Sequence, residues 1–197
     1  MSIKINDLVF RYSNNILFNK LNYSVQSGQI SLIQGPSGCG KSTLLKLIAG
    51  LITAESGEIF ILDSLQKKKI GYLHQDLHLI EHWSIKENLD LVNSDFNIQN
   101  KWLKTFDLTM HSSTLVGTLS GGEKQRVGLI RIILSNADTV LLDEPTAHLD
   151  DIHTEVALNS LKTAFKNKTV LIVSHDQRVQ KYSVIIVNWQ KEIIHVV

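Results

Sequence analysis

The chain has 197 residues, a length that suits one domain, or one domain with a small appended lobe. It is 43% hydrophobic, enough for a sizeable core, and its formal net charge of +1 gives no electrostatic reason to expect nucleic acid as the main partner. The single cysteine excludes an intramolecular disulfide, and no apolar run is long enough for a transmembrane helix or a secretory signal. We therefore expect a cytoplasmic protein that would serve a membrane only by docking to another chain.

Short apolar runs and helical spacing of leucines divide the chain into alternating strands and helices. In chain order the sequence predicts two strands within residues 3–25, a strand at 30–34, a helix at 41–49, strands at 58–62 and 69–74, helices at 84–92, at 101–108 and from after residue 122 to about 135, a strand at 139–142, a helix at 151–165, a strand at 169–174 and a hairpin over 184–197. Ser84 followed by Glu87 matches a capping box. This alternation indicates a parallel sheet covered on both faces, with some antiparallel sheet from the terminal hairpins.

A glycine-rich loop lies between the strand at 30–34 and the helix at 41–49. It matches the pattern G-x-x-x-x-G-K-[ST] completely, with Gly35, Pro36, Ser37, Gly38, Cys39, Gly40, Lys41 and Ser42. Glycines let successive backbone N–H groups turn inward towards phosphate oxygens, and the helix N-terminus adds positive partial charge. Lys41 would reach the β- and γ-phosphates, and Ser42 would ligate Mg²⁺. Strand, loop and helix in this order predict a nucleotide site rather than a chance glycine turn.

Two carboxylates, Asp143 and Glu144, end the apolar strand at 139–142. In an open parallel sheet, ligands bind at the carboxyl edge of the strands. Asp143 would hold Mg²⁺ through its water shell, and Glu144 would be free to take a proton from an attacking water molecule. Many strands end in acids, so this pattern gains weight only from the phosphate loop upstream.

A third motif decides the class: residues 119–126 read Leu-Ser-Gly-Gly-Glu-Lys-Gln-Arg. This segment resembles the signature motif of the ATP-binding-cassette (ABC) family, and the resemblance covers essentially the whole chain in the family's order. It implies that Tyr12 stacks on adenine, that Gln75 senses Mg²⁺ and faces the transport partner, that residues 146–150 cross between two subunits, and that His175 is a switch histidine. Taken alone, each of these residues would have a plain structural role.

The resemblance therefore implies a complete set of site residues. The expected catalytic residues are Lys41, Glu144 and His175, and the expected Mg²⁺ ligands are Ser42, Gln75 and Asp143. The expected ATP contacts are Tyr12, the eight phosphate-loop residues Gly35 to Ser42, Thr43, Gln75, Ser120, Gly121 and Gly122.

The resemblance also implies a fold and partners. We expect an α/β fold: a P-loop NTPase core with a mostly parallel sheet, a small N-terminal antiparallel β lobe and a small helical lobe at about residues 76–118, all within one domain over 1–197. Two copies would sandwich two Mg-ATP head to tail, with Ser120, Gly121 and Gly122 covering the ATP of the partner. A separate membrane-spanning subunit is the other expected partner, which would place the chain on the inner face of the cell membrane.

Two further features have open interpretations. His74, His78 and His82 are spaced four apart, as metal-binding histidines on a helix would be, although a loop is expected there. Cys39 lies near a helix N-terminus, where a thiol gains some reactivity, or else the loop simply needs a small residue.

Three functions fit such an ATPase. The leading one is the energy-supplying subunit of a transporter; the others are mechanical work without transport and regulation of a membrane complex without cargo. Residues 75–79 and 84–89 resemble a stretch common to bacterial exporters and some importers. Because no further domain follows the final hairpin, the sequence favours export of a peptide or amphipathic molecule. We expect residues 75–88 to dock to the membrane subunit, with Trp83 as the anchor unless it packs inside the helical lobe.

Overall fold

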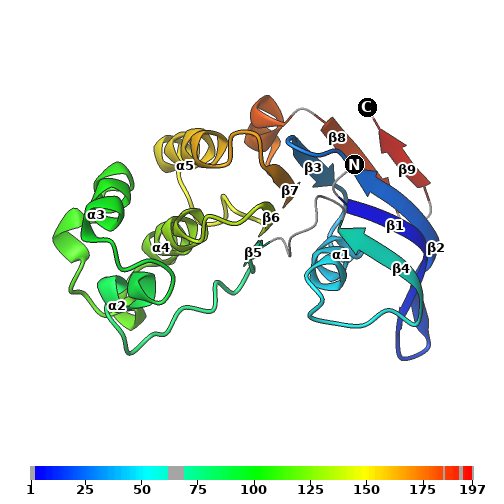
Figure 1. The fold of residues 1–197 in the computed structure, drawn as a ribbon, viewed down its shortest axis with the longest axis horizontal. Coiled ribbons are helices and arrows are strands. Elements are labelled where there is room, and N and C mark those ends of the chain that lie inside the picture. The colour runs from blue at the N-terminus through cyan, green and yellow to red at the C-terminus, as the bar shows by residue number, and fades with distance from the viewer. Residues whose placement is uncertain (1–2, 62–68, 184, 191–192, 197) are drawn as a thin grey trace.

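The computed structural model describes residues 3–61, 69–183, 185–190 and 193–196. It contains two sheets with helices arranged around them (Figure 1). The smaller sheet is antiparallel, in the order β2 (Asn15–Val25), β1 (Ile3–Tyr12) and β4 (Ser56–Ile61). The larger sheet has the order β5 (Ile70–Leu73), β6 (Thr139–Asp143), β7 (Thr169–Val173), β3 (Ile30–Gln34), β8 (Ile185–Gln190) and β9 (Ile193–Val196). Its neighbours pair in parallel except for β8 and β9.

The helices are α1 (Lys41–Ile48), α2 (Ile85–Asp90), α3 (Phe96–Thr105), α4 (Gly121–Leu134) and α5 (Asp151–Ala164), with short 3-10 turns η1 (Thr109–His111), η2 (Val116–Thr118) and η3 (Gln177–Tyr182). The α/β fold with a parallel core, an antiparallel N-terminal sheet and a separate group of helices is therefore confirmed (Figure 1). Within the described residues, no helix is both long and apolar enough to cross a membrane.

Most predicted elements are found within a residue or two of their expected bounds, and α3 is the main exception. The sequence predicted that this helix begins at residue 101, whereas it begins at Phe96. Asp95 caps it: its side chain accepts hydrogen bonds from the backbone N–H groups of Asn97 and Ile98. The predicted capping box of Ser84 and Glu87 is confirmed at the start of α2. Residues 191–192, where the C-terminal hairpin was expected to turn, lie outside the described residues.

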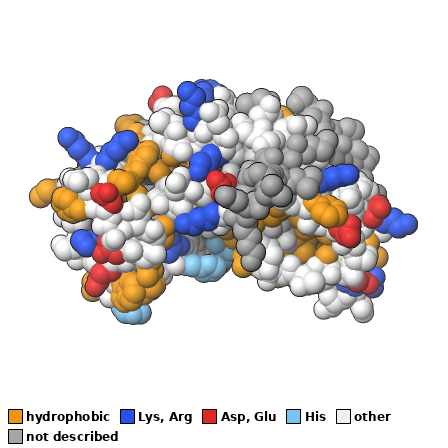
Figure 2. Space-filling view, viewed as in Figure 1, with side chains coloured by type: hydrophobic (Ala, Val, Ile, Leu, Met, Phe, Trp, Pro, Cys, Tyr) orange, Lys and Arg blue, Asp and Glu red, His pale blue; other side chains and the backbone are white. Residues whose placement is uncertain are grey.

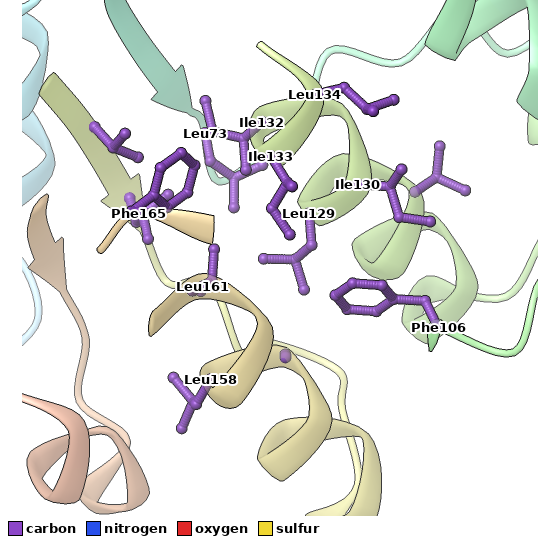
Figure 3. Close-up of a cluster of buried hydrophobic side chains, with 14 of the residues drawn as sticks. Leu73, Phe106, Leu129, Ile130, Ile132, Ile133, Leu134, Leu158, Leu161 and Phe165 are labelled. Atoms are coloured by element: carbon purple, nitrogen blue, oxygen red, sulfur yellow. The ribbon is translucent and has the colours of Figure 1, made fainter. Parts of the chain in front are cut away.

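The central strands are buried on both faces, so their alternate side chains contribute to two different clusters. Leu141 and Leu171 belong to a cluster formed with α1 and the antiparallel sheet. Their neighbours Val140, Leu142 and Val170 point the other way, into a cluster with α4 and α5. Figure 3 shows part of this second cluster, in which side chains of α4 and α5 pack against each other and against Leu73 and Phe106. The two clusters pack against both faces of the large sheet, and the loops at its carboxyl edge stay free to form the site.

Candidate functional site

The parallel strands β3, β5, β6 and β7 all end at the same edge of the large sheet. The loops that leave this edge surround a cavity of about 740 Å³. Its lining residues are Tyr12, Asn15, Leu17, Gly35, Pro36, Ser37, Gly38, Gly40, Lys41, Ser42, Thr43, Gln75, Glu144, Val173 and His175. A volume of this size suits a small-molecule ligand, and the lining mixes backbone, hydroxyl and charged groups.

The phosphate loop needs its glycines for different reasons. Gly38 and Gly40 have φ angles of 77° and 100°, which residues with a side chain rarely adopt. Gly35 is required by packing, because a Cβ there would lie 2.3 Å from the Trp189 carbonyl oxygen. The loop therefore curls tightly over the N-terminus of α1, which begins at Lys41 with Gly40 as its cap.

Lys41 is 8% exposed, and its amine lies inside the curl of the loop. Its Nζ donates to the carbonyl oxygens of Gly35 at 2.8 Å and Pro36 at 2.9 Å. Cys39 differs from its neighbours in the loop. Its side chain is buried in the cluster formed by α1 and the antiparallel sheet and does not line the cavity. The expected contact of Cys39 with ATP can therefore involve only its backbone, and burial argues against the expected reactivity of its thiol.

Ser42 and Asp143 come from opposite sides of the site and meet directly. The Ser42 hydroxyl donates to Asp143 Oδ1 at 3.0 Å, and the Tyr72 hydroxyl donates to Asp143 Oδ2 at 3.4 Å. Burial raises the pKa of Asp143 above its usual range, and the Glu144 carboxylate adds to this, while the bonds from Ser42 and Tyr72 oppose it. A cation beside Asp143 would lower this pKa again, because it stabilises the charged carboxylate.

Glu144 has a strained backbone, with φ of 49°, immediately after β6. Its carboxylate accepts a hydrogen bond from the Ser174 hydroxyl at 2.8 Å, and its other oxygen lies 2.8 Å from His175 Nδ1. Ser174 is fully buried, whereas the His175 side chain is 81% exposed. The structure thus brings Glu144 and His175, two of the expected catalytic residues, together at the ends of adjacent strands β6 and β7.

Tyr12, Thr43 and Gln75, which were expected as ATP contacts, also line the cavity. The Tyr12 ring is 53% exposed and packs edge-on against Phe10, with ring centroids 4.9 Å apart. Its hydroxyl lies 3.4 Å from Thr43 Oγ1. Tyr12 therefore presents an accessible aromatic face at the rim, which is the geometry that stacking on a base requires.

Ser120, Gly121 and Gly122 are not among the residues that line the cavity of their own chain. Ser120 caps α4 and forms a capping box with Glu123. Gly122 packs against the loop after β6, where a Cβ would approach the His148 carbonyl oxygen to 2.9 Å. The signature residues are thus presented at a helix N-terminus, apart from the cavity that the phosphate loop lines.

Three residues that the sequence reasoning did not single out support the site. Ser174 and Tyr72 bond to the two acidic residues, and Gln125 Nε2 donates to the Pro145 carbonyl oxygen at 2.9 Å, tying α4 to the loop after Glu144. Ser174 could have been found from the sequence, since it is a polar residue directly after the apolar run of residues 170–173. Tyr72 and Gln125 act through contacts between elements, which spacing along the chain does not reveal.

Comparison with known proteins places this arrangement in a family. A family model described as ABC transporter matches residues 18–147, more than half of the chain. The chain belongs to the ABC family of ATPases. The match spans the phosphate loop, the signature segment and the acidic strand end of this ABC ATPase. Family membership agrees with the resemblance seen in the sequence.

The relatives of this ABC ATPase include transporter subunits and isolated cassettes. It is 28% identical to the putative hemin import ATP-binding protein HrtA of Staphylococcus saprophyticus, over 93% of this chain and 94% of the relative. It is 30% identical to the Fe(3+) ions import ATP-binding protein FbpC of Fusobacterium nucleatum, over 90% of this chain but only 52% of that protein. A dimeric, post-hydrolysis structure of the ATP-binding cassette MJ0796 bound to ADP and Pi aligns with a TM-score of 0.86 at 26% identity, over 98% of this chain and 97% of that one.

Proposed function

We propose that this ABC ATPase binds Mg-ATP in the cavity at the sheet edge and hydrolyses it to drive a separate membrane-spanning transporter subunit. The observation that best supports this proposal is the position of the Glu144 carboxylate. The carboxylate lies at the cavity and is oriented by Ser174 and His175, next to the Ser42–Asp143 pair. A general base needs this kind of fixed orientation.

The other cavity residues have roles that follow from their chemistry. Lys41, Gly38 and Gly40 would bind the phosphates, and Tyr12 would stack on adenine. Ser42, Gln75 and Asp143 offer hydroxyl, amide and carboxylate oxygens, the hard ligands that Mg²⁺ prefers, so these residues fit the ion. When bound, Mg²⁺ supplies positive charge that neutralises the phosphate oxygens. Glu144 would take the proton of the attacking water, and His175 would hold the carboxylate in place.

The assembly is a second part of the proposal. Ser120, Gly121 and Gly122 lie at the N-terminus of α4, apart from the cavity lining of their own chain, and a helix N-terminus attracts anions. We place these residues over the ATP of a second copy, in a two-fold dimer. The dimeric state of the MJ0796 cassette supports this arrangement.

The direction of transport and the kind of cargo are the most detailed part of the proposal. Export of a peptide or amphipathic molecule is the direction we propose, although residues 75–79 and 84–89 resemble some importers as well as exporters and the curated relatives FbpC and HrtA have import in their names. Reconstitution with the membrane subunit, with ATP added only on the side of this chain, would separate the two outcomes. Release of cargo to the opposite side supports export, and accumulation on the ATP side supports import.

The hydrolysis itself is tested by Lys41→Ala. We expect ATP turnover to fall by more than about 100-fold, because a cation aimed at the phosphates is removed. Phosphate release by the purified chain is the measurement. Lys162→Ala, on the exposed face of α5, is the matched control and should keep wild-type turnover. Wild-type turnover in a folded Lys41→Ala protein would refute the proposed site.

A further inference from the structure

The chain folds back on itself directly after β5. Leu77 and His78 both adopt positive φ angles, 58° and 46°, so the backbone reverses within a few residues of His74. The His74 and His78 rings therefore stack, with centroids 4.3 Å apart and planes inclined by 21°. The sequence had raised a helical row of His74, His78 and His82. In the structure the first two lie together in a turn rather than on a helix. Asp76, and not His82, is the third residue of the group of possible metal ligands.

We propose that His74, Asp76 and His78 form a binding site for a divalent transition-metal ion of the Zn²⁺ class. Each residue offers one ligand atom, and these atoms all lie within 4.8 Å of one another. Two imidazoles and a carboxylate form a ligand set that suits Zn²⁺ and its first-row neighbours, with water completing the coordination. Asp76 and His78 are exposed, so an ion can reach them from solvent.

The surrounding structure holds the three ligands in place. The Arg131 guanidinium on α4 donates to the carbonyl oxygen of Leu77 and, at 2.8 Å, to that of His78. The Leu77 side chain packs over Gly128 of the same helix, where a Cβ would lie 2.8 Å from Leu77 Cδ2. Contacts of this kind explain how two adjacent residues keep a strained backbone. They also reduce the conformational entropy that metal binding must overcome.

To close around an ion, the His74 and His78 rings must rotate out of their stack, because an imidazole nitrogen binds a metal in the plane of its ring and stacked rings cannot both point at one ion. Ligand atoms about 2.0–2.1 Å from a tetrahedral Zn²⁺ lie roughly 3.4 Å apart, so ligand atoms that are now up to 4.8 Å apart must approach by up to about 1.4 Å. His74 Nδ1 now accepts a hydrogen bond from the Asp76 N–H at 3.0 Å and lies 3.4 Å from Asp76 Oδ2. Among the nearby charges, Asp143 favours a cation and Lys46 opposes one. With the Arg131 guanidinium on the His78 carbonyl oxygen, the two nearby cations balance the carboxylates of Asp76 and Asp143, so the three ligand atoms themselves must supply the affinity.

Occupancy of this site would affect the nucleotide cavity. Gln75, which lines that cavity, lies between two of the ligands, His74 and Asp76. An ion bound on both sides of Gln75 would restrict its backbone. Since Gln75 is the residue proposed to respond to Mg-ATP, we infer that the metal slows turnover by holding this segment still. This consequence depends on the proposed function, whereas the binding site itself does not.

The binding test uses Co²⁺ as a spectroscopic probe on the full chain, without nucleotide or Mg²⁺. We expect visible absorption that saturates at one Co²⁺ per chain and is reversed by Zn²⁺. His78→Ala should weaken binding by more than about tenfold, because even loss of a supporting residue around a metal commonly costs that much. His82→Ala removes a nearby exposed histidine outside the cluster and should leave the affinity within about twofold of wild type.

The outcomes distinguish the proposal from nonspecific binding. Saturation at one ion that is lost in His78→Ala but retained in His82→Ala supports the site. No saturable binding, or equal weakening by both substitutions, overturns it. In a second measurement, Zn²⁺ should lower the ATP turnover of the wild type by a larger factor than that of His78→Ala. Equal factors with intact binding would overturn only the coupling to Gln75, and absent turnover would point to failure of the proposed function.

Discussion

At the scale of single residues, the site depends on how β6 and β7 end. Both strands are fully buried along their length, and polar residues follow their apolar stretches at Asp143 in β6 and at Ser174 directly after β7. Parallel pairing in register places Asp143 opposite Val173, so the residues that follow the two strands come together. Glu144 then needs a positive φ to direct its carboxylate towards Ser174 and His175. The strain is tolerated because two hydrogen-bond partners define the position.

Glu144→Gln tests the role of this carboxylate. The amide keeps the size of the side chain but cannot act as a base, so we expect turnover to fall by at least about 100-fold. ATP should then be bound without being split, and the dimer should accumulate. Sedimentation in Mg-ATP and phosphate release measure the two effects.

Glu155→Gln, on the exposed face of α5, is the control for the loss of one negative charge. It should hydrolyse ATP like the wild type and show no extra dimer. A Glu144→Gln protein that stays monomeric at high concentration in Mg-ATP would contradict the composite site, provided that the same sample binds ATP.

At the scale of elements, the sequence predicted what depends on local pattern and missed what depends on contacts. The phosphate loop, the buried strands and the cap at Ser84 follow from residue type and spacing alone, whereas the cap that Ser120 forms on α4 was not predicted. The start of α3 was misplaced because residues 96–100 show no strong apolar periodicity, and the Asp95 cap outweighs it. The proposed metal-ligand cluster of His74, Asp76 and His78 could not be predicted from the sequence either. It depends on two residues with positive φ, and Arg131 holds them through hydrogen bonds.

Gly128 shows how an element is shaped by its neighbour. A glycine inside α4 costs about 1 kcal/mol relative to alanine, which local propensity does not explain. The packing explains it, because Leu77 and Leu73 lie against the helix where a side chain would be. Since Arg131 holds the same segment one turn further along, α4 and the residues around Gln75 are joined at two points.

Gly128→Leu should therefore destabilise the fold. Overpacking of a filled core costs about 1–3 kcal/mol, which for a chain of this size lowers the Tm by roughly 2–4 °C per kcal/mol. Thermal unfolding followed by circular dichroism is the measurement. Lys162→Leu, an exposed position on α5, should change the free energy of unfolding by less than about 0.5 kcal/mol. Equal Tm values for the two variants would show that the groove over Gly128 is not filled.

At the scale of the whole molecule, two parts of the surface are expected to bind different partners. The cavity and the start of α4 would meet a second copy, as would residues 146–150, and Ile152, just after that segment, is 75% exposed. The group of helices carries exposed apolar residues of its own: Leu91, Phe96, Ile98, Met110 and Leu115. Figure 2 shows hydrophobic side chains on the part of the surface formed by α2 and α3. Such a surface is suited to binding another protein.

Trp83 lies in the segment that we predict to dock, between Gln75 and α2. Its backbone is fixed by hydrogen bonds, from its N–H to the Ile80 carbonyl oxygen and from the Val116 N–H to its own carbonyl oxygen. Its ring is half-buried and is not among the apolar side chains that pack against the larger cluster in the described part of the molecule, whereas Trp102 is. This difference favours an anchor at the surface over packing inside the helical lobe.

Trp83→Ala should therefore leave the fold intact but weaken coupling to the membrane subunit. We expect its Tm to stay within about 4 °C of wild type, since no core cluster loses a side chain. Partner-stimulated ATP turnover in lipid should fall by at least about tenfold, because a large aromatic anchor contributes 2 kcal/mol or more to an interface. Trp102→Ala is the matched control: it removes a ring that packs on the core, so it should lower the Tm further while partner stimulation persists in the folded fraction. If the Trp83→Ala protein unfolds first, or if its stimulated turnover equals that of the wild type, the docking surface lies elsewhere, and the exposed residues of α3 become the next candidates.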